Sequence, residues 1–132
     1  MLTVLVVEDD ALVLRFCHLV LTNIDGFEVL KAENGTAALD VSDHHHGAID
    51  LLLSDIAMPD GPNGIELAEI LRNCRPQMRV LLMSGCDYEA CVLSKGWQFI
   101  SKPFLPAALV SKIELVLEHP LHQRQRTTSL AS

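Results

Sequence analysis

Residues 1–10, which read MLTVLVVEDD, decide the fold, because a Val-rich apolar run ends there abruptly in three acidic side chains. A short, continuous apolar run of this kind is typical of a β-strand buried on both faces. Similar runs recur along the chain. The sequence therefore predicts five strands, at residues 2–7, 27–32, 49–54, 80–83 and 99–101.

The segments between these strands carry helix signals. Asp10 is placed to cap a first helix, and Asn34 begins a weaker one that ends near residue 42. A third helix ends at Arg75-Pro76, a last one begins at Leu105-Pro106, and the short segment 88–94 leaves open whether it is helical. The residues expected to face inward are Val13, Phe16, Cys17, Val20, Leu67, Ile70, Leu71, Cys74, Leu109, Ile113, Val116 and Leu117.

Strands that alternate with helices indicate a parallel sheet covered on both faces, since each crossover between parallel strands is right-handed. We therefore predict an α/β fold, a three-layer α/β/α sandwich. The length of 132 residues fits one domain, which we place at 1–118, followed by a flexible tail at 119–132.

Composition excludes several classes of protein. A net charge of −7 disfavours direct binding to nucleic acid, and 49% hydrophobic residues exclude wholesale disorder. There is no apolar run long enough to span a membrane and no basic segment of a secretory signal, so we expect a cytoplasmic protein that does not enter membranes. The four cysteines lack zinc spacing, and Cys17 and Cys74 lie on apolar stripes, which predicts buried, reduced thiols.

Polar residues follow the strands at the points where ligands bind in open α/β sheets. Glu8 and Asp9 follow the first strand and Asp55 follows the third, so three carboxylates should meet at one edge of the sheet. Their repulsion is relieved by a hard divalent cation such as Mg²⁺ or Mn²⁺, which prefers oxygen ligands. Ser84 and Lys102 arrive at the same edge and offer a hydroxyl and a positive charge to a phosphoryl group. These residues predict phosphoryl transfer onto Asp55.

The segments VLVVEDD, LLLSDIAMP, LLMSG and SKPF, in this order, resemble the receiver domain of bacterial two-component response regulators, in particular the single-domain, chemotaxis-regulator-like kind. The resemblance covers residues 2–118. It implies the strand order 2-1-3-4-5, which makes the first and third strands neighbours. It also implies a domain that changes its protein–protein interactions when phosphorylated.

The resemblance implies a role for each site residue. Asp55 would accept a phosphoryl group from a histidine kinase or a histidine phosphotransfer protein. Asp9 would bind Mg²⁺ directly, Glu8 would hold metal-bound water, and the backbone carbonyl of Ala57 would complete the protein ligands. Ser84 would be the switch hydroxyl, Lys102 would pair with the phosphoryl group next to a cis bond to Pro103, and Phe99 would be the aromatic switch residue.

The sequence departs from the family pattern in three places. Phe99 lacks a hydroxyl, so any switch there must act by packing, and Gly85 removes a side chain beside the acceptor. The loop at 59–64 is one residue longer than usual. Only residues 85–101 separate Ser84 from Lys102, about one helical turn fewer than usual, which puts the fourth helix and its output face in question.

Other interpretations stay open. A Mg²⁺-dependent phosphohydrolase with an aspartyl nucleophile is one, although Ala57 stands where a second acid is wanted; a constitutive docking domain is another. We expect no enzymatic activity other than the protein's own phosphorylation and dephosphorylation. The output is expected to be binding of a partner protein or homodimerisation. The three histidines at 44–46 indicate a surface segment that binds metal only adventitiously. Tyr88 and Trp97 are interpreted either as ordinary packing residues or as part of a surface that binds a partner.

Overall fold

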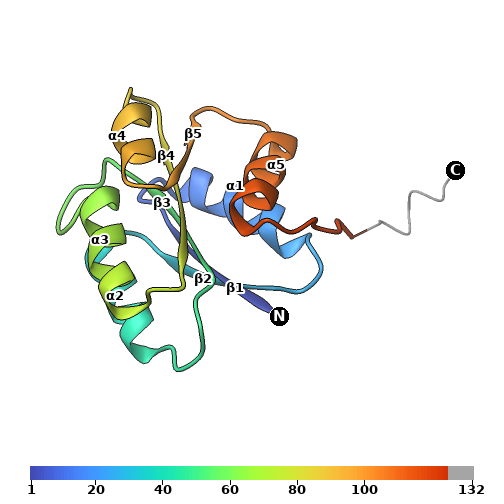
Figure 1. The fold of residues 1–132 in the computed structure, drawn as a ribbon, viewed down its shortest axis with the longest axis horizontal. Coiled ribbons are helices and arrows are strands. Elements are labelled where there is room, and N and C mark those ends of the chain that lie inside the picture. The colour runs from blue at the N-terminus through green and yellow to red at the C-terminus, as the bar shows by residue number, and fades with distance from the viewer. Residues whose placement is uncertain (125–132) are drawn as a thin grey trace, which may run out of the picture.

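Five parallel strands form one sheet in the order β2-β1-β3-β4-β5, with helices on both faces (Figure 1). The computed structural model describes residues 1–124. The strands are β1 (Leu2–Val7), β2 (Phe27–Ala32), β3 (Leu51–Asp55), β4 (Arg79–Ser84) and β5 (Gln98–Ser101). The helices are α1 (Ala11–Thr22), α2 (Gly35–His44), α3 (Gly64–Cys74), α4 (Glu89–Ser94) and α5 (Pro106–Leu117).

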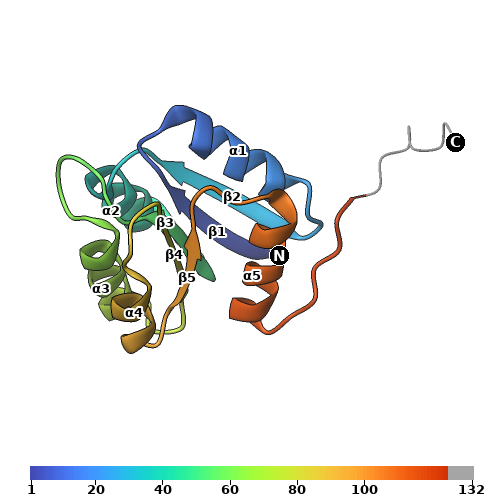
Figure 2. The ribbon, with the colours of Figure 1, turned by 90° about the horizontal axis from the view of Figure 1, so that it is seen from above.

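The sheet separates two apolar clusters. Successive side chains of a strand point to opposite faces, so Val4 and Val6 of β1 join the cluster under α1 and α5, whereas Leu5 and Val7 join the one under α2, α3 and α4. Figure 2 shows α1 and α5 on one side of the sheet and the other three helices on the opposite side. The predicted three-layer α/β/α architecture and strand order are confirmed.

Local signals place the helices. The Asp10 carboxylate accepts hydrogen bonds from the N–H groups of Leu12 and Val13, which caps α1. The Asn34 side chain caps α2, and α3 begins with a capping box between Asn63 and Glu66. These caps fix how each chain segment leaves the carboxyl end of a strand.

Some expectations about the helices were wrong. In α3 the buried stripe is Gly64, Leu67, Ala68 and Leu71, so Ile70 is 41% exposed and Cys74, at the last helical position, is exposed as well. The reason is helical phase: the buried face is centred between Gly64 and Leu71, with Leu67 and Ala68 at its edges, so Ile70 lies more than a quarter turn away from this centre. The helix α2 continues to His44, beyond the expected end near residue 42.

The open question about residues 88–94 is answered by α4, a six-residue helix in which only Val92 is buried. Among the cysteines, Cys17 is buried and free, and burial raises the pKa of its thiol to about 12. Within residues 1–124, no helix is long and apolar enough to cross a membrane.

The segment after α5 was expected to be a flexible tail, but its described part, residues 119–124, makes specific contacts. Gln123 forms an antiparallel bridge with Ile24, and the N–H of Arg124 donates to the carbonyl of Asn23. Leu121 packs against the apolar cluster under α1 and α5. Residues 119–124 are thus attached to the turn between α1 and β2, whereas the expectation for 125–132 lies outside the described residues.

Candidate functional site

Three carboxylates converge where β1 and β3 end. One oxygen each of Glu8, Asp9 and Asp55 lie within 4.8 Å of one another, although Asp55 is more than 40 positions away in the sequence. They meet because β1 and β3 are neighbours and Val7 is paired with Ser54 in register. Glu8 and Asp55 are buried, with 1% and 6% of their surfaces exposed, whereas Asp9 is exposed.

The backbone around the acids is tightly held. The N–H of Glu8 donates to Ala32 of β2, and a carboxylate oxygen of Glu8 accepts the N–H of Asp10 at 3.0 Å. On the other strand, the N–H of Ile56 donates to the Met83 carbonyl, so β3 stays paired with β4 beyond Asp55. Both buried carboxylates therefore project from fixed strand ends.

Gly64 also shapes the site, and the sequence reasoning missed its role. Its N–H donates to the carbonyl of Ile56, and a Cβ atom at this position would overlap the carbonyl oxygen of Asp55. Only a residue without a side chain lets the start of α3 approach the strand so closely. The available signal was its place directly after Pro62-Asn63 at a helix start, but the close approach itself is a tertiary contact.

Lys102 reaches the acids from the loop after β5. Its Nζ atom lies 2.6 Å from Glu8 Oε1 and 3.3 Å from Asp55 Oδ1. Its backbone N–H donates to Ser84, the last residue of β4, and the Lys102–Pro103 peptide bond is cis. The lysine thus pairs with both buried carboxylates at the same edge of the sheet.

The site is short of positive charge. Burial raises the pKa of the Asp55 carboxyl, and repulsion from Asp9 adds to this, while Lys102 acts in the opposite direction. Burial also raises the pKa of Glu8 against the lowering effect of Lys102. For Lys102, burial lowers the pKa, but contact with the two carboxylates outweighs it and the net pKa is raised. One ammonium does not compensate three carboxylates.

This donor set fits a hard divalent cation. The converging atoms are all carboxylate oxygens, and their mutual repulsion is the condition that such an ion relieves. Ala57, the other expected ligand, lies in the exposed loop one residue after Ile56. The three histidines at 44–46 are not part of this acidic group, and His44 Nδ1 instead donates a hydrogen bond to the Asp40 carbonyl.

The two expected switch residues occupy different surroundings. Ser84 is 2% exposed at the end of β4, and its Oγ atom accepts a hydrogen bond from the N–H of Cys86 at 2.9 Å. Phe99 is 3% exposed and belongs to the cluster under α2, α3 and α4. Tyr88 is 38% exposed and Trp97 is half-buried, with Lys95 Nζ 5.7 Å from its ring centroid.

Comparisons with known proteins agree with this geometry. Residues 4–114 match the family described as response regulator receiver domain. Among curated proteins, the chain is 37% identical over 110 residues to the transcriptional regulatory protein MalR of Bacillus subtilis, covering 79% of this chain and 45% of MalR. It is 30% identical over 135 residues to a cyclic di-GMP phosphodiesterase of Thermotoga maritima, covering 99% of this chain and 35% of that protein. The chain therefore spans less than half the length of either relative.

Solved structures are also similar. A CheY-like response regulator receiver domain protein from Methanospirillum hungatei has a TM-score of 0.78 and 29% identity, over 89% of this chain and 94% of that one. The response regulator TrrA of Thermotoga maritima, solved in complex with Mg²⁺ and BeF, has a TM-score of 0.76 and 28% identity, over 89% of this chain and 100% of that one. The chain belongs to the response regulator receiver domain family, whose members are phosphoacceptor domains of two-component signal transduction.

Proposed function

We propose that Asp55 is the phosphoacceptor of this receiver domain and that its phosphorylation switches the binding of a partner protein. The donor is a phosphohistidine on a histidine kinase or a histidine phosphotransfer protein. One observation carries the proposal: Asp55 ends a central strand, with two further carboxylates within 4.8 Å and Lys102 Nζ at 3.3 Å. Such a donor is made with ATP in the cytoplasm, where we place the domain.

In the reaction, a carboxylate oxygen of Asp55 forms a bond to phosphorus while the bond between phosphorus and the donor imidazole nitrogen breaks. The imidazole keeps the electron pair of that bond and takes up a proton. Lys102 pairs with the equatorial phosphoryl oxygens, on which negative charge is concentrated. Asp9, Asp55 and the Ala57 carbonyl would hold Mg²⁺, with Glu8 holding its bound water, and the ion would supply further neutralisation of this charge.

The response begins from the contacts that Ser84 and Lys102 make here. Lys102 shifts its interaction from Glu8 toward the phosphoryl oxygens, and the Ser84 hydroxyl leaves the N–H of Cys86 to donate to one of them. Ser84 ends β4, and Lys102 follows β5, the strand that contains Phe99. Phe99 lies in the buried cluster under α4. Phe99 has no hydroxyl, so its part in the switch is a change of packing.

The donor docks on the apolar surface beside Lys102. A groove of about 280 Å³ lies there between α1 and the loop after β5, lined by Leu12, Val13, Phe16, Lys102, Pro103 and Phe104. Leu12 is 79% exposed, and Leu105, in the loop after β5, is 73% exposed. This surface therefore offers a partner apolar area directly next to the acceptor.

The experiment is incubation of the protein with acetyl phosphate and Mg²⁺, followed by intact mass. We expect one added phosphoryl group on the wild type and none on Asp55→Asn. Asp60→Asn is the matched control, because Asp60 is an exposed acid in the loop after Asp55, and it should be phosphorylated like the wild type. Phosphorylation of Asp55→Asn to the wild-type extent would remove Asp55 as the acceptor.

The same preparation separates a signalling domain from an enzyme. We expect no sustained turnover of a phosphomonoester, because Ala57 offers no side-chain acid to protonate a leaving group. Partner binding that is identical for phosphorylated and unphosphorylated protein would favour a constitutive docking domain.

A further inference from the structure

A second cavity lies at the opposite edge of the sheet from Asp55. It has a volume of about 460 Å³ and is formed where β4 and β5 begin, with Arg79 and Gln98 as the first residues of these strands. The C-terminal parts of α3 and α5 complete it. Pockets that hold small molecules commonly have volumes of about 300–1,000 Å³. The lining residues include Arg72, Arg79, Val80, Trp97, Gln98 and Glu118.

This cavity is positively charged in an otherwise acidic protein. The net charge of the chain is −7, yet residues 70–86 contain three arginines and no acidic residue. Two of these arginines, Arg72 and Arg79, line the cavity, and Glu118 is its one lining acid. Within residues 1–124, Glu118 pairs with Arg79, and no carboxylate lies within ion-pair distance of Arg72. The local charge therefore favours an anion.

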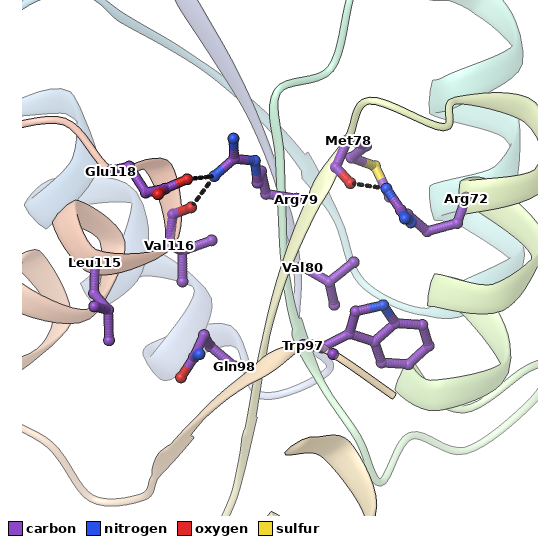
Figure 3. Close-up of a pocket in the computed structure, with 10 residues that line it drawn as sticks. Arg72, Met78, Arg79, Val80, Trp97, Gln98, Leu115, Val116 and Glu118 are labelled. Atoms are coloured by element: carbon purple, nitrogen blue, oxygen red, sulfur yellow. Dashed lines mark hydrogen bonds and ion pairs between the residues drawn. The ribbon is translucent and has the colours of Figure 1, made fainter. Parts of the chain in front are cut away.

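Both guanidinium groups are oriented by the protein and retain free donors. Arg72 donates through Nη1 to the carbonyls of Pro76 and Met78. Arg79 donates through Nη1 to the Val116 carbonyl and the Glu118 carboxylate (Figure 3). Among the described residues, the Nε and Nη2 atoms of both arginines make no side-chain hydrogen bond. Each arginine therefore keeps the N–H groups that bind phosphate oxygens in pairs.

The remaining lining residues suit a flat, polar ring. Figure 3 shows the indole of Trp97 and the side chain of Val80 on the same side of β4 as Arg72, whereas Gln98 lies on the other side, with Arg79. Trp97 is half-buried, so one part of its ring is available for stacking. The Gln98 amide offers both a donor and an acceptor, as the edge of a nucleobase requires.

We propose that this cavity binds a nucleoside monophosphate, with the phosphate paired to Arg72 and Arg79 and the base against Trp97. Inorganic phosphate alone would leave Trp97 and Val80 without a contact, and an uncharged nucleoside would leave both arginines unpaired. The assignment does not depend on phosphorylation of Asp55.

Trp97 is the only tryptophan of the chain, so its fluorescence reports directly on the site. The protein is titrated with AMP and GMP in buffer that contains EDTA, which keeps nucleotide–Mg²⁺ complexes away from the acidic cluster. We expect saturable quenching by at least one nucleotide. Adenosine, guanosine and inorganic phosphate should each bind at least about tenfold more weakly, since each lacks half of the contacts.

Variants separate the cavity from general charge effects. Arg79→Gln and Gln98→Ala change side chains that are exposed or half-buried, and each should weaken nucleotide binding by about tenfold. Arg75→Gln is the matched control: it removes the same charge from the same segment, but Arg75 donates to Ser42, Gly47 and His45 and does not line the cavity. Arg75→Gln and Asp55→Asn should bind like the wild type.

Three results would overturn the proposal: no saturation with either nucleotide, equal affinity for inorganic phosphate, or equal weakening by Arg75→Gln and Arg79→Gln. Saturation by an acidic peptide in the absence of any nucleotide response would assign the surface to a protein partner instead.

Discussion

Lys102 and Glu8, which are 94 positions apart in the sequence, form the shortest ion pair of the site, with 2.6 Å between Nζ and Oε1. The Glu8 side chain is 1% exposed and that of Lys102 is 22% exposed. A charge in such surroundings is stable only when it is paired. The pair therefore links the loop after β5 to the end of β1 and keeps the lysine beside Asp55.

Replacing Lys102 by Met should lower the free energy of unfolding by about 3 kcal/mol at neutral pH, because Glu8 is left buried without its partner. The loss should be larger at pH 8 than at pH 5. The pKa of Glu8 is already raised by burial, and a folded-state pKa above the unfolded value means that stability falls as pH rises. Urea unfolding at the two pH values measures this. The double variant Glu8→Gln, Lys102→Met should recover most of the loss, and an equal loss in both variants would contradict the argument.

Asp55→Asn should raise the stability of the protein in buffer without divalent cations. Burial and Asp9 raise the pKa of Asp55 despite the opposing effect of Lys102, so the ionised carboxylate is less favourable in the folded state than in the unfolded chain at neutral pH. We expect a gain of about 1 kcal/mol, the size of one screened charge–charge interaction at this range. Thermal unfolding in EDTA checks the sign of this stability change. A lower melting temperature for Asp55→Asn would show that the attraction of Lys102 outweighs burial and the repulsion from Asp9.

Millimolar Mg²⁺ should raise the melting temperature of the wild type, since a ligand that binds only the folded state stabilises it by RT ln(1 + [L]/Kd). Asp9→Ala removes the exposed member of the acidic group and should abolish this dependence. Asp10→Ala is a suitable comparison, because Asp10 caps α1 and is not part of the group: it should lower stability yet keep the response to Mg²⁺. A melting curve that is unaffected by Mg²⁺ would contradict binding of the cation at this site.

Much of this site was accessible from the sequence because it depends on strand ends. Apolar runs identified the strands, and in a parallel sheet the residues that follow them must gather at one edge. Glu8, Asp9, Asp55 and Lys102 are therefore predictable as neighbours from the sequence. Apolar runs alone do not give strand order. The family resemblance implied that the first and third strands are adjacent.

Other features depend on tertiary contacts that leave no local pattern. Periodicity grouped Ile70 and Cys74 with the core, but the buried face of α3 includes Gly64 and Ala68, two residues too small to mark a face in an apolar pattern. The polar composition after residue 118 hid the pairing of Gln123 with Ile24, because a single bridge requires no apolar run. The close approach of Gly64 to Asp55 could not be predicted either, because it is a contact between two separate elements, α3 and β3.

The attached segment 119–124 should contribute to stability chiefly through Leu121. This side chain packs against the cluster under α1 and α5, and its N–H donates to the Glu114 carboxylate. Leu121→Ala should lower the free energy of unfolding by about 1–2 kcal/mol, less than a fully buried leucine. Arg124→Ala should cost about 0.5 kcal/mol or less, because its ion pair with Asp25 is exposed on both sides. If urea unfolding shows that Leu121→Ala and Arg124→Ala lose equal free energy of unfolding, the packing of Leu121 is not the main contribution of this segment.

Gly64→Ala should disturb Asp55, the proposed phosphoacceptor, without changing any charged group. The added Cβ would overlap the Asp55 carbonyl oxygen and approach the Cα of Ile56, so either α3 or the end of β3 must move. We expect a loss of about 1–3 kcal/mol, typical of overpacking, and slower phosphorylation of Asp55 by acetyl phosphate. Gly85→Ala is the matched control: Gly85 also follows a strand at this edge, but a Cβ there meets nothing within 4 Å. It should retain wild-type stability and phosphorylation. If the two variants lose stability and rate equally, the close approach of α3 to β3 does not position Asp55.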